Sequence, residues 1–147
     1  KAKYFFKKSK LFTISDDSGL CIDCLNGNPG IYSARWAKRH GSFKQAMMKI
    51  IETIKNKNKD KKIKNTRAKF VCSLTFSFSA VKKITTIGII YGNISEKILG
   101  KKGFGYDPIF IPRGKKITFG QMNKKKKILM DHRFLAFKKL KKKINIL

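Results

Sequence analysis

Acidic residues are scarce in this chain of 147 residues, in which 8 Asp and Glu face 36 Lys and Arg, for a formal net charge of +28. Such an excess of positive charge suggests nucleic-acid binding. Arginine is scarce too, with 5 residues against 31 lysines, and arginine is the side chain best suited to phosphate and base recognition. Lysine, isoleucine, asparagine and phenylalanine, which A/T-rich codons specify, are abundant together. Compositional drift therefore explains the charge better than a specific nucleic-acid partner.

Cysteine is limited to three residues, two of which form the C-x-x-C spacing at 21–24. A structural zinc site needs about four ligands, and the chain has no second pair of this kind and no paired histidines. Leu20, Ile22 and Cys24 alternate along the chain as the buried face of a strand does. The cysteines are therefore interpreted as small apolar residues.

Long apolar runs are absent, since no segment approaches the roughly 20 residues that a membrane-spanning helix needs. The basic first ten residues lack the apolar stretch of a signal peptide. A hydrophobic fraction of 41% is ordinary for a globular protein. We therefore expect a single domain over 1–147, with no membrane partner and a cytoplasmic location.

Periodicity and turn residues predict a mixture of helices and strands, and hence an α/β or α+β fold. The expected segments are a helix end at 1–10, short strands at 11–14 and 20–25, a loop at 26–30, a loop entering a short helix at 31–40, a helix capped by Ser42 with apolar Phe43, Ala46, Met47, Ile50, Ile51 and Ile54, a solvated linker at 55–65, paired strands at 66–80 and 81–91, a glycine-rich loop at 100–105, an extended segment at 106–111, and one or two helices from 123 onward.

The first candidate for chemistry is the acidic segment 15–19, between the two short strands expected at 11–14 and 20–25. Mg²⁺ prefers one or two carboxylates together with phosphate oxygens of a substrate. A carboxylate near a metal also orients or deprotonates an attacking water. Asp16 and Asp17 suit both roles, although an Asp-rich β-turn accounts for the same residues.

The second candidate is the segment 103–108, in which Phe104 stands between two glycines. A phenylalanine with so little local packing is available to stack on a planar ligand, and Asp107 is a suitable acceptor for N–H groups on the edge of a base. The alternative is a turn with a core aromatic. A fainter candidate lies at 127–133, where Lys127 and Asp131 would pair at i, i+4 on a helix.

Five short sequence motifs occur here in a fixed order, and with them the chain resembles the inosine/xanthosine triphosphate pyrophosphatase family. They lie at 16–20 (DDSGL), 28–35 (NPGIYSAR), 67–70 (RAKF), 103–110 (GFGYDPIF) and 132–133 (HR). The resemblance runs from Lys1 to about Leu140. It implies an α/β fold with an elongated mixed sheet, flanking helices and two lobes around a nucleotide cleft, usually in a homodimer. It also implies Mg²⁺-dependent hydrolysis of ITP, dITP or XTP to the monophosphate and pyrophosphate.

The resemblance also assigns roles to individual residues. Asp17 matches the catalytic carboxylate that helps to hold the metal, and Asp16 is its neighbour in that site. The positions matching substrate contacts are Ser18, Phe104, Gly105, Tyr106, Asp107, Lys127, His132 and Arg133, of which Phe104 matches the base-stacking residue and His132 and Arg133 the pair that reads the 6-oxo purine edge.

The chain departs from the family pattern at three places. Asp131 stands where serine is usual, and Gln121 where an acidic residue is common. The resemblance begins at Lys1-Ala2, matching a helix end, so the first strand, the phosphate loop and a metal-binding glutamate are expected to be missing. Two hypotheses compete with an active hydrolase: a truncated, inactive relative with residual nucleotide binding, and a basic nucleic-acid-binding protein.

Overall fold

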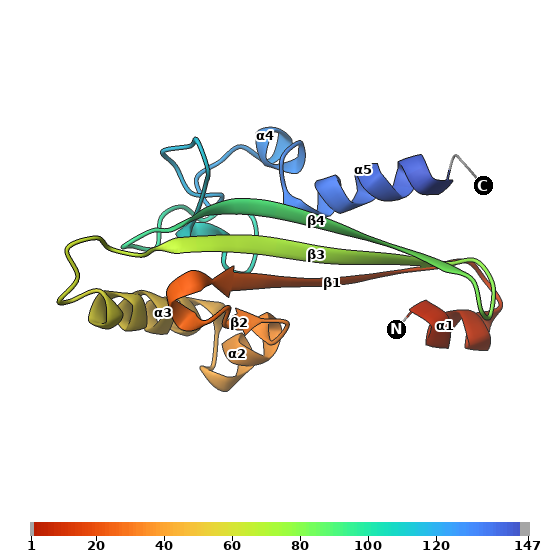
Figure 1. Cartoon of the computed structure of the whole chain (residues 1–147), viewed down its shortest axis with the longest axis horizontal. Coiled ribbons are helices and arrows are strands. Elements are labelled where there is room, and N and C mark those ends of the chain that lie inside the picture. The colour runs from red at the N-terminus through yellow and green to blue at the C-terminus, as the bar shows by residue number, and fades with distance from the viewer. Residues whose placement is uncertain (1, 145–147) are drawn as a thin grey trace.

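Three long antiparallel strands form the frame of the fold (Figure 1). The structure is a computed structural model and describes residues 2–144. These strands are β1 (Thr13–Ile22), β3 (Arg67–Ser77) and β4 (Lys83–Ile94), and the short β2 (Pro29–Gly30) and β5 (Phe110–Pro112) complete a five-stranded sheet of order β2-β1-β3-β4-β5. The helices are α1 (Ala2–Ser9), α2 (Ser33–Arg39), α3 (Phe43–Lys57), α4 (Lys124–Ile128) and α5 (His132–Ile144), with single 3₁₀ turns at Asp23–Leu25 and Asp107–Ile109.

The expected α/β class, with an elongated sheet and flanking helices, is confirmed. All four strand pairings within residues 2–144 are antiparallel, whereas the resemblance implied a mixed sheet. β3 and β4 form a hairpin, whose strands are necessarily antiparallel, and β1 also runs against β3. The Ala2 end of the expected first helix is helical and buried, and Lys1 lies outside the described residues.

β1 is one continuous strand, so the expectation of two short strands at 11–14 and 20–25, separated at the acidic segment, was wrong. Every residue from Thr13 to Ile22 pairs with β3, in a register that runs from Thr13↔Ser77 to Ile22↔Ala68 without interruption. An unbroken ladder outweighs the local turn preference of aspartate, serine and glycine, because strand preference depends strongly on tertiary context. The consequence is that Asp16 and Asp17 lie within a strand.

Side chains of β1 alternate between two faces of the sheet, as in any strand. One face, called the covered face here, carries Asp16, Ser18, Leu20 and Ile22. The hydrophobic core lies on this face, where Leu20 and Ile22 are fully buried in one cluster with the apolar side of α3. The core side of α3 is the one expected from helical spacing, and Ser42 caps the helix by accepting a hydrogen bond from the backbone N–H of Gln45.

α5 lies along β3 and β4 (Figure 1), and Gly88 lets it approach closely. A Cβ at Gly88 would collide with the backbone of His132 and Ala136. Thr86 also donates a hydrogen bond of 2.9 Å to the carbonyl of Ala136. The first turn of α5 is thus held directly on the sheet.

The expected i, i+4 pair between Lys127 and Asp131 was wrong, because the helix is interrupted between them. α4 ends at Ile128, and the Asp131 carboxylate accepts a hydrogen bond of 2.9 Å from the backbone N–H of Phe134 in the first turn of α5. An aspartate at this position satisfies a backbone donor that the helix itself leaves unpaired.

All three cysteines are free, with Cys72 buried and the other two half-buried. Within residues 2–144, no group of three or more His, Cys, Asp or Glu is placed to hold a metal ion. In the same range, no helix has the length and apolar character needed to cross a membrane.

Candidate active site

The loop around Phe104 is folded over a buried carboxylate. Gly103 and Gly105 have φ angles of 77° and 61°, which glycine adopts readily. The backbone N–H of Phe104 donates a hydrogen bond of 2.7 Å to Asp107, and a Cβ at Gly103 would collide with the same carboxylate. The Phe104 ring is held outward and is 58% exposed, as a stacking platform requires.

The partner of Asp107 is Lys127, at the end of α4. The ammonium lies 2.6 Å from the carboxylate, and the two side chains are only 8% and 2% exposed. Burial raises the pKa of Asp107, and the hydrogen bond from Lys127 offsets part of that effect. Asp107 was expected to accept hydrogen bonds from a base, but the structure uses this carboxylate inside the protein.

Two cations flank the Phe104 ring. The Lys127 ammonium lies 4.8 Å from the ring centroid, and the Arg133 guanidinium lies 4.7 Å from it. Both distances are within the range of a cation–π interaction. Residues from two separate helices thus meet the loop at a single aromatic side chain.

Arg133 connects this platform to β1. Its Nε donates a hydrogen bond of 2.6 Å to Asp16, and Ser18 donates one of 2.7 Å to the other oxygen of Asp16. Partial burial would raise the pKa of Asp16, but the hydrogen bonds from Ser18 and Arg133 and the guanidinium charge outweigh it, so the pKa is lowered. Asp16 therefore acts as an ionised anchor for Arg133.

His132 lies behind the platform, 3% exposed, with its ring stacked on Phe70 at 4.9 Å. Burial, followed by the charge of Arg133, lowers the pKa of His132 to about 4. The imidazole is thus neutral at neutral pH. Its Nδ1 has no hydrogen-bond partner within residues 2–144.

The low pKa of His132 predicts acid sensitivity. Between pH 6.5 and about 4 the unfolded chain binds a proton at this residue that the folded chain does not, so stability is fully present above pH 6.5 and declines as the pH falls. The loss amounts to about 3 kcal/mol on the scale of 1.36 kcal/mol per pKa unit. Urea unfolding from pH 7 to pH 4.5 measures it.

His132→Gln is the control for this prediction, because glutamine does not titrate. The variant is expected to lose about 2–3 kcal/mol less than the wild-type protein over that pH range, whatever its stability at pH 7. Equal losses in the two proteins would show that other groups cause the acid sensitivity.

Tyr106 and Gly105 support the platform from within. The Tyr106 hydroxyl donates a hydrogen bond of 2.9 Å to the Ser33 carbonyl in α2, and the ring packs edge-on against Phe43. A Cβ at Gly105 would touch the same Phe43 ring. Burial raises the pKa of Tyr106 to about 12. Both residues were expected to contact substrate. Tyr106 lies in the protein interior, 3% exposed, whereas Gly105 is half-buried next to the exposed Phe104.

Asp17 does not share a face with Asp16. Adjacent strand residues point to opposite sides of the sheet, so Asp17 lies on the face opposite Ser18 and Arg133, where it is exposed to solvent. The two carboxylates therefore do not form a pair that could chelate a metal ion together. The described residues fit a metal only through Asp17, as a single oxygen ligand beside those that water and phosphate supply.

The sequence interpretation missed the ion pair between Asp16 and Arg133, whose residues are 117 positions apart, and the pair between Asp107 and Lys127, which are 20 positions apart. No local spacing signals either pair. The scarcity of acidic residues was the available hint, because a carboxylate that is buried or partly buried needs a partner or a ligand, and this chain of net charge +28 has only 8 acidic residues.

Comparison with known proteins gives one family match and many relatives. The profile of the Ham1 family matches residues 1–143. A dITP/XTP pyrophosphatase of Clostridium perfringens is 40% identical over 141 residues, covering 95% of this chain and 67% of the relative. That of Dictyoglomus thermophilum is 42% identical over 142 residues, covering 96% and 67%. The chain spans about two thirds of the length of these curated relatives.

Two solved structures share the fold. A HAM1 protein from Coxiella burnetii superposes with a TM-score of 0.88 at 28% identity, covering 99% of this chain and 73% of that protein. The Ham1 protein of Staphylococcus aureus gives 0.83 at 34% identity, covering 98% and 72%. The likeness thus extends over nearly all of this chain.

Proposed function

The chain belongs to the Ham1 family, and from this membership we propose that it takes part in hydrolysing the aberrant purine nucleotides dITP, ITP and XTP to the monophosphate and pyrophosphate. Relatives that are 36–42% identical are named dITP/XTP pyrophosphatases. The observation in the structure that carries the proposal is the exposed Phe104 ring between Lys127 and Arg133.

The platform suits a 6-oxo purine. A base stacked on Phe104 gains aromatic contact of about 1–3 kcal/mol. Asp16 engages Arg133 at Nε, which leaves the terminal amino groups of the guanidinium to donate to a keto oxygen. An adenine amino group at this position would face donors and find no acceptor, which disfavours ATP and dATP.

The phosphate chain would pass over the edge of β1. β2 pairs with β1 only at Leu20 and Cys21, so the edge beside Asp16 and Asp17 is not covered by β2. A nucleotide stacked on Phe104 would lie on the side of Asp16, and its triphosphate would cross this edge toward Asp17. That path uses both faces of the strand.

Asp17 would act at the scissile anhydride. We assign it the role of orienting the attacking water and accepting its proton, while the bond between the α- and β-phosphates breaks and pyrophosphate leaves. Asp17 would also be the protein ligand of Mg²⁺, which when bound neutralises charge on the phosphate oxygens. The site would work in the cytoplasm, where nucleotide pools are found, and in a homodimer, as the resemblance implies.

Pyrophosphate release from dITP and from dATP, with and without Mg²⁺, tests the proposal. We expect release from dITP that depends on Mg²⁺, with kcat/KM at least about 100-fold above that for dATP. Equal rates for the two nucleotides would contradict the assigned base recognition. No release from dITP, together with measurable dITP binding, would support the competing hypothesis of an inactive relative.

A further inference from the structure

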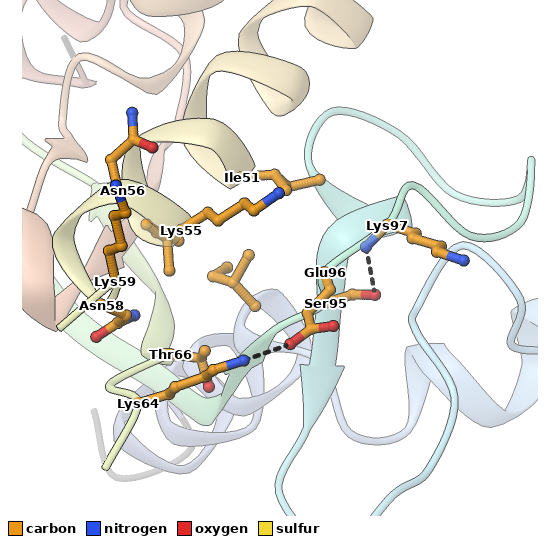
Figure 2. Close-up of a pocket in the computed structure, with 12 residues that line it drawn as sticks. Ile51, Lys55, Asn56, Asn58, Lys59, Lys64, Thr66, Ser95, Glu96 and Lys97 are labelled. Atoms are coloured by element: carbon orange, nitrogen blue, oxygen red, sulfur yellow. Dashed lines mark hydrogen bonds and ion pairs between the residues drawn. The ribbon is translucent and has the colours of Figure 1, made fainter. Parts of the chain in front are cut away.

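A second concave site lies away from Phe104, between the C-terminal half of α3 and the segment that follows β4 (Figure 2). The pocket has a volume of about 620 Å³, within the range typical of small-molecule sites. Its lining shares no residue with the candidate active site. The residues of α3 that form one wall run from Ile51 to Asn56, and Ile94 to Lys97 form the opposite wall.

The base of the pocket is apolar and its walls are ordered. Ile54 and Ile94 are 5% and 4% exposed. Asn58, 4% exposed, clamps the loop before β3 by donating to the Asn65 carbonyl and accepting from the Asn65 backbone N–H, at 3.1 and 3.0 Å. These contacts give the pocket a defined shape, because buried side-chain hydrogen bonds of this kind fix backbone position.

The rim is strongly cationic. The pocket is lined by a single carboxylate, Glu96, and by four lysines, so that its lining carries a net charge of +3; the lysines are Lys55, Lys59, Lys64 and Lys97. Figure 2 shows Lys64 joined to Glu96. The two charged groups are 3.6 Å apart, and the side chains of Lys64 and Glu96 are 68% and 79% exposed. An exposed pair of this length contributes little. The other three lysines have no ion-pair partner within residues 2–144.

We propose that this pocket binds a small organic anion that carries a phosphate group beside an apolar or aromatic body. Lysine ammonium groups bind phosphate as point charges, and three lysines without partners match a doubly charged group better than a single carboxylate. The two buried isoleucines provide contact for the apolar body of the ligand. The site is distinct from the proposed nucleotide site and does not depend on it.

Phenyl phosphate, inorganic phosphate and benzoate are the probes. Amide chemical shifts of the ¹⁵N-labelled 147-residue chain, recorded in physiological salt, locate and quantify their binding. We expect saturable shifts from phenyl phosphate at 56–59 and 94–97, with an affinity at least about threefold above that of either other probe, because only phenyl phosphate uses both the lysines and the apolar base. Equal affinity for benzoate, or shifts confined to the Phe104 loop, would overturn the proposal.

A charge-matched pair of variants separates a built site from general attraction by a basic protein. Lys59→Glu/Lys97→Glu changes the lining charge from +3 to −1 and is expected to weaken phenyl phosphate binding at least about tenfold. Lys7→Glu/Lys8→Glu makes the same change in net charge at exposed lysines of α1, at the opposite end of the molecule from α3 (Figure 1), and is expected to weaken it less than about twofold, since screened distant charges contribute little. Equal weakening by both variants would overturn the proposal.

Discussion

Replacing Asp17 by Asn is expected to lower kcat for pyrophosphate release from dITP by at least about 100-fold, the usual contribution of a positioned general base. The change is isosteric but removes the negative charge and the proton acceptor. Asp17 lies exposed in β1, where a polar contact contributes little, so the variant is expected to lose less than about 1 kcal/mol of stability. Steady-state kinetics with dITP and Mg²⁺ and urea unfolding of the same preparations measure the two effects.

Asp16→Asn is the matched control, since it makes the same chemical change one residue earlier and on the opposite face of the strand. Asp16 accepts hydrogen bonds from Arg133 and Ser18. Removing the carboxylate charge is therefore expected to affect the reaction indirectly, by changing the position of Arg133. KM for dITP should rise and discrimination against dATP should weaken, with a smaller effect on kcat than that of Asp17→Asn. A larger loss of kcat in the Asp16 variant would reverse the assigned roles.

Lys127→Met is expected to destabilise the protein by about 3–5 kcal/mol, the cost of leaving one partner of a buried ion pair uncompensated. Both side chains are almost fully enclosed, and Asp107 also holds the backbone N–H of Phe104. Methionine keeps much of the volume of the lysine stem, so the lost charge dominates. Urea unfolding at pH 7 measures the change in the free energy of unfolding.

The double variant Lys127→Met/Asp107→Asn tests the cause. Without the carboxylate there is no buried charge to leave unpaired, and the asparagine oxygen still accepts a hydrogen bond from Phe104. The double variant is therefore expected to be at least about 1 kcal/mol more stable than Lys127→Met alone. Additive losses would mean that the two residues stabilise the protein independently.

The sequence alone determined the elements whose pattern is local. The helix that Ser42 caps and the hairpin of β3 and β4 follow from spacing, capping and β-branched runs, which depend on neighbours a few residues apart. The helix continues to Lys57, into the segment that was expected to be a linker from residue 55. The exposure of Phe104 was also predictable, because flanking glycines leave an aromatic ring with little local packing. The five sequence motifs and their order along the chain were sufficient to indicate the family.

Only the tertiary structure decided how the acidic residues are used. Pairing with β3 joined the two short strands expected on either side of Asp16 and Asp17 into one strand, in which their side chains point to opposite faces. Folding brought Lys127 to Asp107 instead of Asp131, and Arg133 to Asp16. Such pairs join residues that are distant in sequence, and their energy depends on burial and distance in the folded chain, which no local pattern records.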